Sequence, residues 1–169
     1  MSLLAKILDS VGIPEDELVK LLISDTKEVF SSMVGMEDVL HLPSQIEPIT
    51  HFEGCMTAMV GMAGTFSGLV SIHTPQSMAM QITSSMLGME VTEVNDDVSD
   101  ALGEIANMIA GSFKLHLTRS GTADIRISTP SVVAGSEYVV AAGNASNTIT
   151  LRFATDTDWF IVAATLQKE

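Results

Sequence analysis

The stretch CMTAMVGMAGTFSGLVSIHT, Cys55 to Thr74, decides the predicted fold. It holds two runs of apolar and small residues that suit extended backbone, and the runs meet among glycines. We expect a β-hairpin with its turn near Gly64, because glycine adopts turn conformations without steric cost. The glycines are not a phosphate-binding loop, since no G-K-S/T sequence and no helix follow them directly.

Helices are predicted on both sides of this hairpin, from apolar residues that recur every three or four positions. Prolines, acidic residues and glycines mark where these helices begin and end. The predicted helices are a short amphipathic one over 3–11, a long one from Pro14 to about Met33 with Gly35 beyond it, one from Pro75 to Gly88 with Thr74 as N-cap, and one over 98–117 that ends by Gly121.

The strands are predicted mostly near the C-terminus, over 125–128, 131–135, 138–142, 147–155 and 158–166. The segment His41 to Pro48, with two prolines, is predicted as a linker or an irregular entry into the sheet. Because helices and strands each come mostly in runs, we expect an α+β fold, with long helices packed on an antiparallel-rich β-sheet and a weak internal repeat. We expect a single domain over 1–169, with 1–14 as a candidate N-terminal extension.

The composition is that of a globular protein, with 46% hydrophobic and 17% charged residues. Lys and Arg total 8 against 21 Asp and Glu, and this net charge of −13 repels nucleic acid phosphates and anionic membranes. It suits solubility, or a partner with a basic rim. The absence of a long apolar segment, of a signal-peptide pattern and of any cysteine besides Cys55 predicts a cytoplasmic protein.

The usual catalytic and metal-binding patterns are missing from the sequence. His41, His51, His73 and His116 show no paired metal-ligand spacing, and Cys55 stands alone, so we expect no zinc site. We expect each histidine at the surface or half-buried. No serine lies in a G-x-S-x-G elbow.

The predicted helix over 98–117 has an unusual outer face. At about 100° per residue, Glu104 lies about 40° from Asp100 and Asn107 about −20° from it, so the three side chains share one narrow face, which we call the polar ridge. The opposite side is an apolar stripe of Val98, Leu102, Ile105, Ile109 and Phe113.

A polar face opposite an apolar stripe occurs on any surface helix, but three details favour a binding surface here. The polar ridge has no Lys or Arg at i, i+4 to pair its acids. Asn is a mediocre residue inside a helix. The bordering glycines, Gly103 and Gly111, each cost roughly 1 kcal/mol relative to Ala and clear space for another molecule to approach.

The spacing Asp100-x₃-Glu104-x₂-Asn107-x₂₂-Pro130 resembles the signature of the CheC/CheX/FliY phosphatases of bacterial chemotaxis, D/S-x₃-E-x₂-N-x₂₂-P. The segments GEIANMIAG, TPSVVAG and MTAMVGMAGTFSGLVSIHT also resemble that family, over about residues 45–165. The resemblance implies a CheC-like fold. CheC-type members often carry the motif twice, but here the second helix holds only Ser77, Gln81 and Ser84. One intact site per chain looks like CheX, whose members are typically homodimers.

The resemblance implies a mechanism, because the family hydrolyses the phospho-aspartate of the response regulator CheY. The acyl phosphate and the Mg²⁺ belong to the regulator, so no cofactor of the phosphatase's own is expected. Asn107 would position the attacking water, and Glu104 would dock on the regulator's active-site lysine. Asp100 would have a supporting or docking role, and Pro130 would shape the chain beside the helix.

Two alternatives stay open at this stage. A CheX-like domain can act as a non-catalytic adaptor in a signalling or motor complex, although pure docking would not require Asn107. A hydrolase with Asp100 and Glu104 as an acid/base pair is less well supported, because adjacent turns of an exposed helix offer no enclosed pocket.

Overall fold

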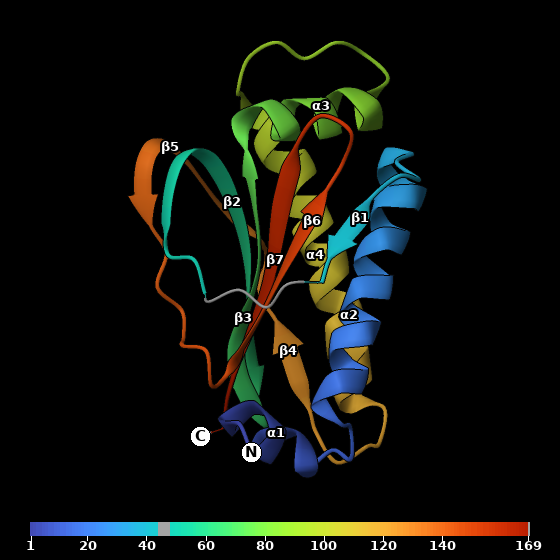
Figure 1. Ribbon diagram of the computed structural model, residues 1–169, viewed down its shortest axis with the longest axis vertical. Coiled ribbons are helices and arrows are strands. Elements are labelled where there is room, and N and C mark those ends of the chain that lie inside the picture. The colour runs from blue at the N-terminus through green and yellow to red at the C-terminus, as the bar shows by residue number, and fades with distance from the viewer. Residues whose placement is uncertain (44–47, 169) are drawn as a thin grey trace.

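The computed structural model describes residues 1–43 and 48–168. Within them the chain forms helices on one side of a single sheet (Figure 1). The helices are α1 (Leu3–Asp9), α2 (Glu15–Val29) continued by a π-helical turn (Phe30–Val34), α3 (Gln76–Leu87) and α4 (Asp96–Thr118). The strands are β1 (Leu40–Leu42), β2 (His51–Gly64), β3 (Phe66–Pro75), β4 (Ile125–Ile127), β5 (Ser131–Val139), β6 (Thr148–Ala154) and β7 (Trp159–Lys168).

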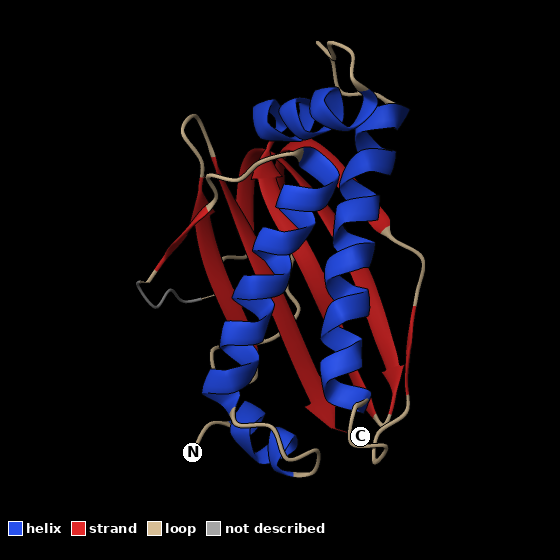
Figure 2. Ribbon diagram, turned by 90° about the vertical axis from the view of Figure 1, so that its right-hand side faces the viewer, coloured by secondary structure: helices blue, strands red, loops and turns tan. Residues whose placement is uncertain are grey.

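The sheet is antiparallel throughout its described pairs, with the order β1-β6-β7-β3-β2-β4 and with β5 also paired to β2. The predicted α+β fold is therefore confirmed. The hairpins β2–β3 and β6–β7 lie side by side through the antiparallel pair β3–β7. The weak internal repeat stays a prediction. Figure 2 shows α2 and α4 lying side by side along one face of the sheet, with α3 across one end.

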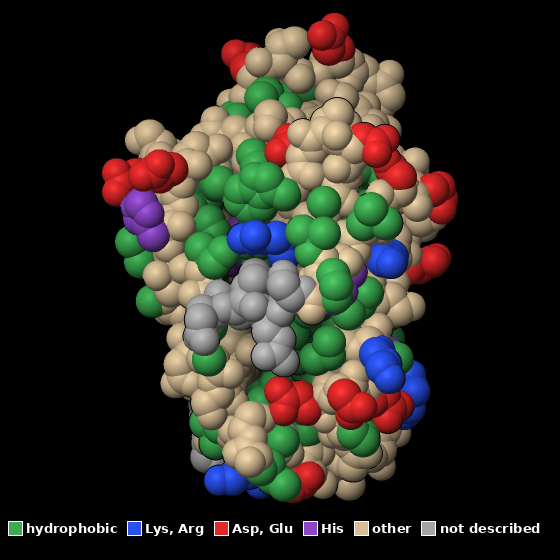
Figure 3. All heavy atoms as spheres, in the orientation of Figure 1, with side chains coloured by type: hydrophobic (Ala, Val, Ile, Leu, Met, Phe, Trp, Pro, Cys, Tyr) green, Lys and Arg blue, Asp and Glu red, His purple; other side chains and the backbone are tan. Residues whose placement is uncertain are grey.

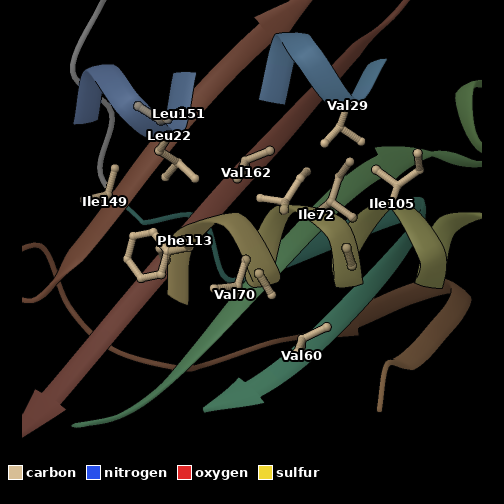
Figure 4. Packing of buried hydrophobic residues seen from close by; sticks show 14 of the residues in the cluster. Leu22, Val29, Val60, Val70, Ile72, Ile105, Phe113, Ile149, Leu151 and Val162 are labelled. Carbon is tan, nitrogen blue, oxygen red and sulfur yellow. The ribbon is translucent and has the colours of Figure 1, made fainter. Parts of the chain in front are cut away.

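The core fills the space between this helical layer and the sheet. Figure 4 shows Leu22 and Val29 of α2 and Ile105 and Phe113 of α4 directed toward apolar residues of the strands. Full burial of one such side chain contributes roughly 1.5–3 kcal/mol, so this stripe fixes the rotation of α4 about its axis. The opposite face of α4 is consequently turned outward.

The predicted hairpin turn is confirmed at Gly64. Its φ of 130° lies in a region that residues with a side chain rarely adopt. A Cβ added there would lie 2.2 Å from the carbonyl oxygen of Asp124, so glycine is also required by the close approach of the chain that leads into β4. The next residue, Thr65, donates its N–H to the same oxygen at 2.9 Å.

Two local predictions are wrong. Thr74 is not the N-cap of α3, because β3 continues to Pro75, which takes the cap position with no side-chain hydrogen bond. The separate strands expected over 131–135 and 138–142 are one strand, β5, because its pairing along β2 keeps the intervening Gly-Ser-Glu extended. Of the predicted linker His41 to Pro48, residues 41–42 belong to β1, and 44–47 lie outside the described residues.

The histidine prediction is wrong for two of the four residues, which are buried. His73 bonds Thr57 Oγ1 at 2.7 Å and Ser71 Oγ at 2.9 Å, and burial lowers its pKa to about 4. His116 is paired through Nε2 with Asp25 Oδ2 at 2.6 Å. Thr57 and Asp25 reach these rings from distant parts of the chain, and Ser71 lies two residues from His73. These bonds offset most of the cost of burying polar groups, although the buried Nδ1 of His116 has no hydrogen-bond partner in the described residues.

No helix in residues 1–43 and 48–168 has both the length and the apolar character needed to span a bilayer.

Candidate functional site

The site is built on α4, whose N-terminus is well capped. The side chain of Asn95 accepts a hydrogen bond from the N–H of Val98 at 3.2 Å, and Asp96 and Asp97 lie in the first turn. A side-chain cap and early acids both satisfy the free N–H groups and positive dipole of a helix start. The helix therefore begins at Asp96, slightly before the predicted range, and runs unbroken past the polar ridge.

The structure turns the polar ridge away from the core. Asp100 and Glu104 are exposed and Asn107 is half-buried, whereas Val98 and Ile105 on the opposite side are fully buried. The three ridge residues thus share the outer surface of consecutive turns, as the helical spacing predicts.

The polar ridge has no partner within the described part of the chain. The side-chain hydrogen bonds made within α4 involve His116 and Thr118, near its C-terminal end. The ion pairs found in the described residues are His51–Glu137 and His116–Asp25, so no Lys or Arg neutralises Asp100 or Glu104. Two carboxylates and an amide are left available to another molecule.

Pro130, the last residue of the motif, lies against this helix. A Cβ added to Gly103 would lie 3.3 Å from Pro130 Cβ and 3.7 Å from Val132 Cγ2. The absence of a side chain at Gly103 therefore lets Pro130 pack directly on α4, next to Glu104. The 22 residues between Asn107 and Pro130 bring the chain back to the same helix, one turn before Asn107.

The sheet explains why Pro130 reaches α4. The edge of β2 pairs with β4 as far as Ile127 and with β5 from Ser131 onward. Between them, Ser128 donates its N–H to the carbonyl oxygen of Gly61 and accepts the N–H of Gly61 at its hydroxyl oxygen, both at 2.9 Å. A proline has no N–H for the ladder, so the interruption suits Pro130.

The prediction about the bordering glycines is right for one and wrong for the other. The space beside Gly103 is filled by Pro130 and Val132 of the same chain, so it does not admit another molecule. Gly111 has nothing within 4 Å of an added Cβ, and the helical spacing places it on the side of the polar ridge. The open approach to the ridge is thus on its C-terminal side.

The corresponding positions on α3, which we call the α3 face, are Ser77, Gln81 and Ser84. Ser77 donates to Asp158 Oδ2 at 2.8 Å, and Thr157 donates to Gln81 Oε1 at 3.3 Å. Ser84 donates to a backbone carbonyl of its own helix at 2.8 Å. The turn between β6 and β7 therefore occupies the outer part of the α3 face.

The polar ridge lacks the third ligand that a metal site would need. In the described residues, the group of His, Asp, Glu or Cys side chains that can converge on one ion lies elsewhere, at His51, Glu53 and Glu137 of β2 and β5. The ridge therefore offers charge and an amide to a partner.

Comparison with known proteins now decides the family. A family model described as "Chemotaxis phosphatase CheX" matches residues 56–154, which include the hairpin, α3, α4 and Pro130. The chain belongs to the CheX family. The predicted resemblance to the CheC/CheX/FliY proteins is confirmed.

Individual CheX proteins are similar over most of the chain. A Thermotoga maritima protein described as "CheY-P phosphatase CheX" is 26% identical over 124 residues, which cover 73% of this chain and 79% of that protein. A crystal structure of CheX from Desulfovibrio desulfuricans is 28% identical, with a TM-score of 0.74 over 89% of this chain and 99% of that one. A Borrelia burgdorferi CheX, solved in complex with CheY, BeF₃ and Mg²⁺, is 18% identical and shares the fold, with a TM-score of 0.70 over 89% and 98%.

Proposed function

We propose that this chain hydrolyses the aspartyl phosphate of a CheY-type response regulator. The observation that carries the proposal is the polar ridge, which presents Glu104 and Asn107 on the outward face of α4 with no partner in the described chain. The name of the Thermotoga maritima relative supports the same substrate. In the reaction a water oxygen attacks phosphorus, the bond from phosphorus to the aspartyl oxygen breaks, and a carboxylate and inorganic phosphate result.

Asn107 would position the attacking water. Its amide has both a donor and an acceptor, so one side chain can hold a water molecule and still approach the phosphoryl oxygens. A carboxylate in the same place would repel the phosphoryl group. Orientation of a water is also the role of the glutamine in GTPases, where positioning and electrostatics supply most of the catalysis.

Glu104 would dock on the lysine of the regulator's active site. Its carboxylate is exposed and has no basic neighbour in the described chain, so it is free to form a charge-assisted bond that becomes shielded in the complex. Asp100, one turn earlier on the same face, would support that docking. Pro130 would act as a positioning residue, because it packs on α4 at Gly103 and so holds in place the part of the helix that carries Glu104.

The Mg²⁺ of the reaction would arrive on the regulator. The Borrelia burgdorferi structure contains CheX, CheY, BeF₃ and Mg²⁺ together, which supports a metal supplied with the phosphorylated partner. The chain itself would need no cofactor for this reaction.

We also propose that the chain works as a cytoplasmic homodimer and that 1–169 is one domain. Residues 1–14 would be an addition to the family's fold. Three apolar residues of α1 belong to the same buried core as the other elements, which supports a single domain: Leu4, Ile7 and Leu8. Light scattering at several concentrations tests the dimer, with a mass near twice 18.0 kDa expected.

The test of the proposed function is loss of phosphate from a phosphorylated CheY-type regulator after removal of the phosphodonor. Wild type should accelerate the loss, while Asn107→Ala and Glu104→Ala should not, although both stay folded. Gln81→Ala, the matching change on the α3 face, should leave the rate unchanged. If wild type binds regulators without accelerating the loss from any of them, the chain is a non-catalytic adaptor. An acid/base role for Asp100 and Glu104 is disfavoured, because both lie exposed rather than in a pocket.

A further inference from the structure

A second cluster of chemically capable side chains lies on the paired strands β2 and β5. His51, Glu53 and Glu137 each offer one ligand atom, and these atoms all lie within 4.8 Å of one another. His51 Nε2 and Glu137 Oε1 are 2.7 Å apart. Figure 3 shows histidine and acidic side chains gathered over this end of the sheet, on the left of the view.

The strand register brings the three residues together. Glu53 is the direct cross-strand partner of Glu137, and His51 lies two residues before Glu53. Since side chains alternate along a strand, residues two apart emerge on the same face. His51 therefore reaches Glu137 diagonally, while Phe52 and its partner Tyr138 emerge on the other face.

The backbone beneath the cluster is held by that other face. Phe52 is buried and stacks on His73, with ring centroids 4.3 Å apart, and it lies 5.6 Å from the ring of Tyr138. The Tyr138 hydroxyl bonds Thr57 Oγ1 at 2.7 Å. A packed and hydrogen-bonded layer of this kind fixes the strands that carry the ligands, so that little conformational freedom is lost on binding.

The two carboxylates of the cluster favour binding of a cation. Glu53 and Glu137 stand directly opposite each other, an arrangement that destabilises a sheet when both are ionised. Within the described residues neither carboxylate has a Lys or Arg within 4.0 Å, and their basic neighbour is His51 alone. A divalent ion held between the three side chains would remove this repulsion.

We propose that His51, Glu53 and Glu137 bind one Zn²⁺ or a chemically similar divalent transition-metal ion. An imidazole nitrogen with two carboxylates suits zinc, whereas Mg²⁺ and Ca²⁺ favour oxygen ligands throughout. Three protein ligands leave the fourth tetrahedral position to water. The sequence predicted no zinc site because the ligands come from two strands and have no recognisable spacing along the chain.

The experiment is a titration of the untagged, chelator-treated full chain with ZnCl₂ in a calorimeter. Wild type should bind one Zn²⁺ per chain, and Co²⁺ in the same site should give the visible absorption of a tetrahedral complex. His51→Gln and Glu137→Gln each remove one ligand and keep the side-chain size. Each should weaken binding at least tenfold, since even the loss of a residue that only supports a ligand costs about 10–100-fold.

Matched variants keep the result specific. His41→Gln removes a histidine from the far edge of the sheet, Glu93→Gln removes an exposed acid, and Cys55→Ser removes the single thiol of the sequence, which lies close to the cluster along the chain. All three should bind Zn²⁺ as wild type does, and circular dichroism checks that every variant is folded. The proposal is overturned if wild type shows no saturable binding, if His51→Gln and Glu137→Gln bind unchanged, or if Cys55→Ser abolishes binding.

Discussion

The helices α3 and α4 carry the same spacing of polar positions and use it in opposite ways. On the α3 face, Ser77 and Gln81 are bonded to the turn between β6 and β7. On α4, the corresponding Asp100 and Glu104 have no bonded partner in the described chain. All four residues are exposed, so exposure does not distinguish the two faces. What distinguishes them is whether the protein's own residues bond these polar side chains, because side chains that are bonded only by water are available to a partner.

The two helices also differ in what holds them. Pro130 packs into the space at Gly103 and braces α4 from the sheet, on the side adjoining the polar ridge. The α3 face is braced by hydrogen bonds that use the polar positions themselves. The bracing of α4 therefore leaves its polar positions free, and substitutions on the two helices should have different consequences.

The largest contrast is expected from the same chemical change on each helix. Asn107→Asp places a carboxylate beside the phosphoryl group and removes the amide donor, so the dephosphorylation rate should fall about a hundredfold or more. Gln81→Glu on the α3 face should leave the rate unchanged. Single-turnover phosphate release measures both. An active Asn107→Asp enzyme would remove the amide from the mechanism.

The packing at Gly103 should also be sensitive to a larger side chain. A valine there has its Cβ at 3.3 Å from Pro130 Cβ and adds two further methyl groups, so we expect Gly103→Val to lose about 2 kcal/mol of unfolding free energy. Urea denaturation measures the change. Its double variant with Pro130→Gly, which removes both Cβ and Cγ, should recover part of the loss, and an additive result would show that the two residues do not act through this contact.

A smaller effect is expected where the α3 face is locked. Asp158→Ala removes the acceptor of the 2.8 Å bond from Ser77, and the cost should be about 1 kcal/mol of unfolding free energy, with the dephosphorylation rate unchanged. A cycle with Ser77→Ala isolates the bond. A lowered rate in Asp158→Ala would mean that the α3 face also takes part in the reaction.

The smallest predicted effect is a gain. Gly111 lies inside α4 with open space where a Cβ would be, so Gly111→Ala should raise the unfolding free energy by about 0.5 kcal/mol. Thermal unfolding detects the rise. The matching Gly103→Ala should gain less or lose stability, because its Cβ meets Pro130. Equal gains at both positions would contradict the bracing described here.

Much of this architecture follows from local patterns. The helical spacing of Asp100, Glu104 and Asn107, the turn at Gly64 and the helix end at Gly88 each depend on residues within one element, and the structure has them as predicted. The class of fold follows from the order of such elements.

What the sequence missed depends on contacts between distant segments. Thr74 has the composition of an N-cap, but the pairing of β3 carries the strand to Pro75. His73 is buried because Thr57 and Ser71 satisfy both ring nitrogens across or along strands. No local pattern shows that Pro130 fills the space at Gly103. Sheet register and packing between elements decide these outcomes, and the spacing of residues within one element does not predict either of them.

The proposal that Glu104 docks on the regulator while Asn107 positions water is tested most directly by one pair of measurements. These are the binding and the turnover of Asn107→Ala with one regulator. Affinity is measured for the beryllofluoride form of the regulator with Mg²⁺, and turnover as single-turnover loss of its phosphate. If Asn107 positions water after docking, the dissociation constant should stay within about threefold of wild type while the rate falls about a hundredfold. If binding weakens as much as the rate, Asn107 is a docking residue and the mechanism proposed here is contradicted.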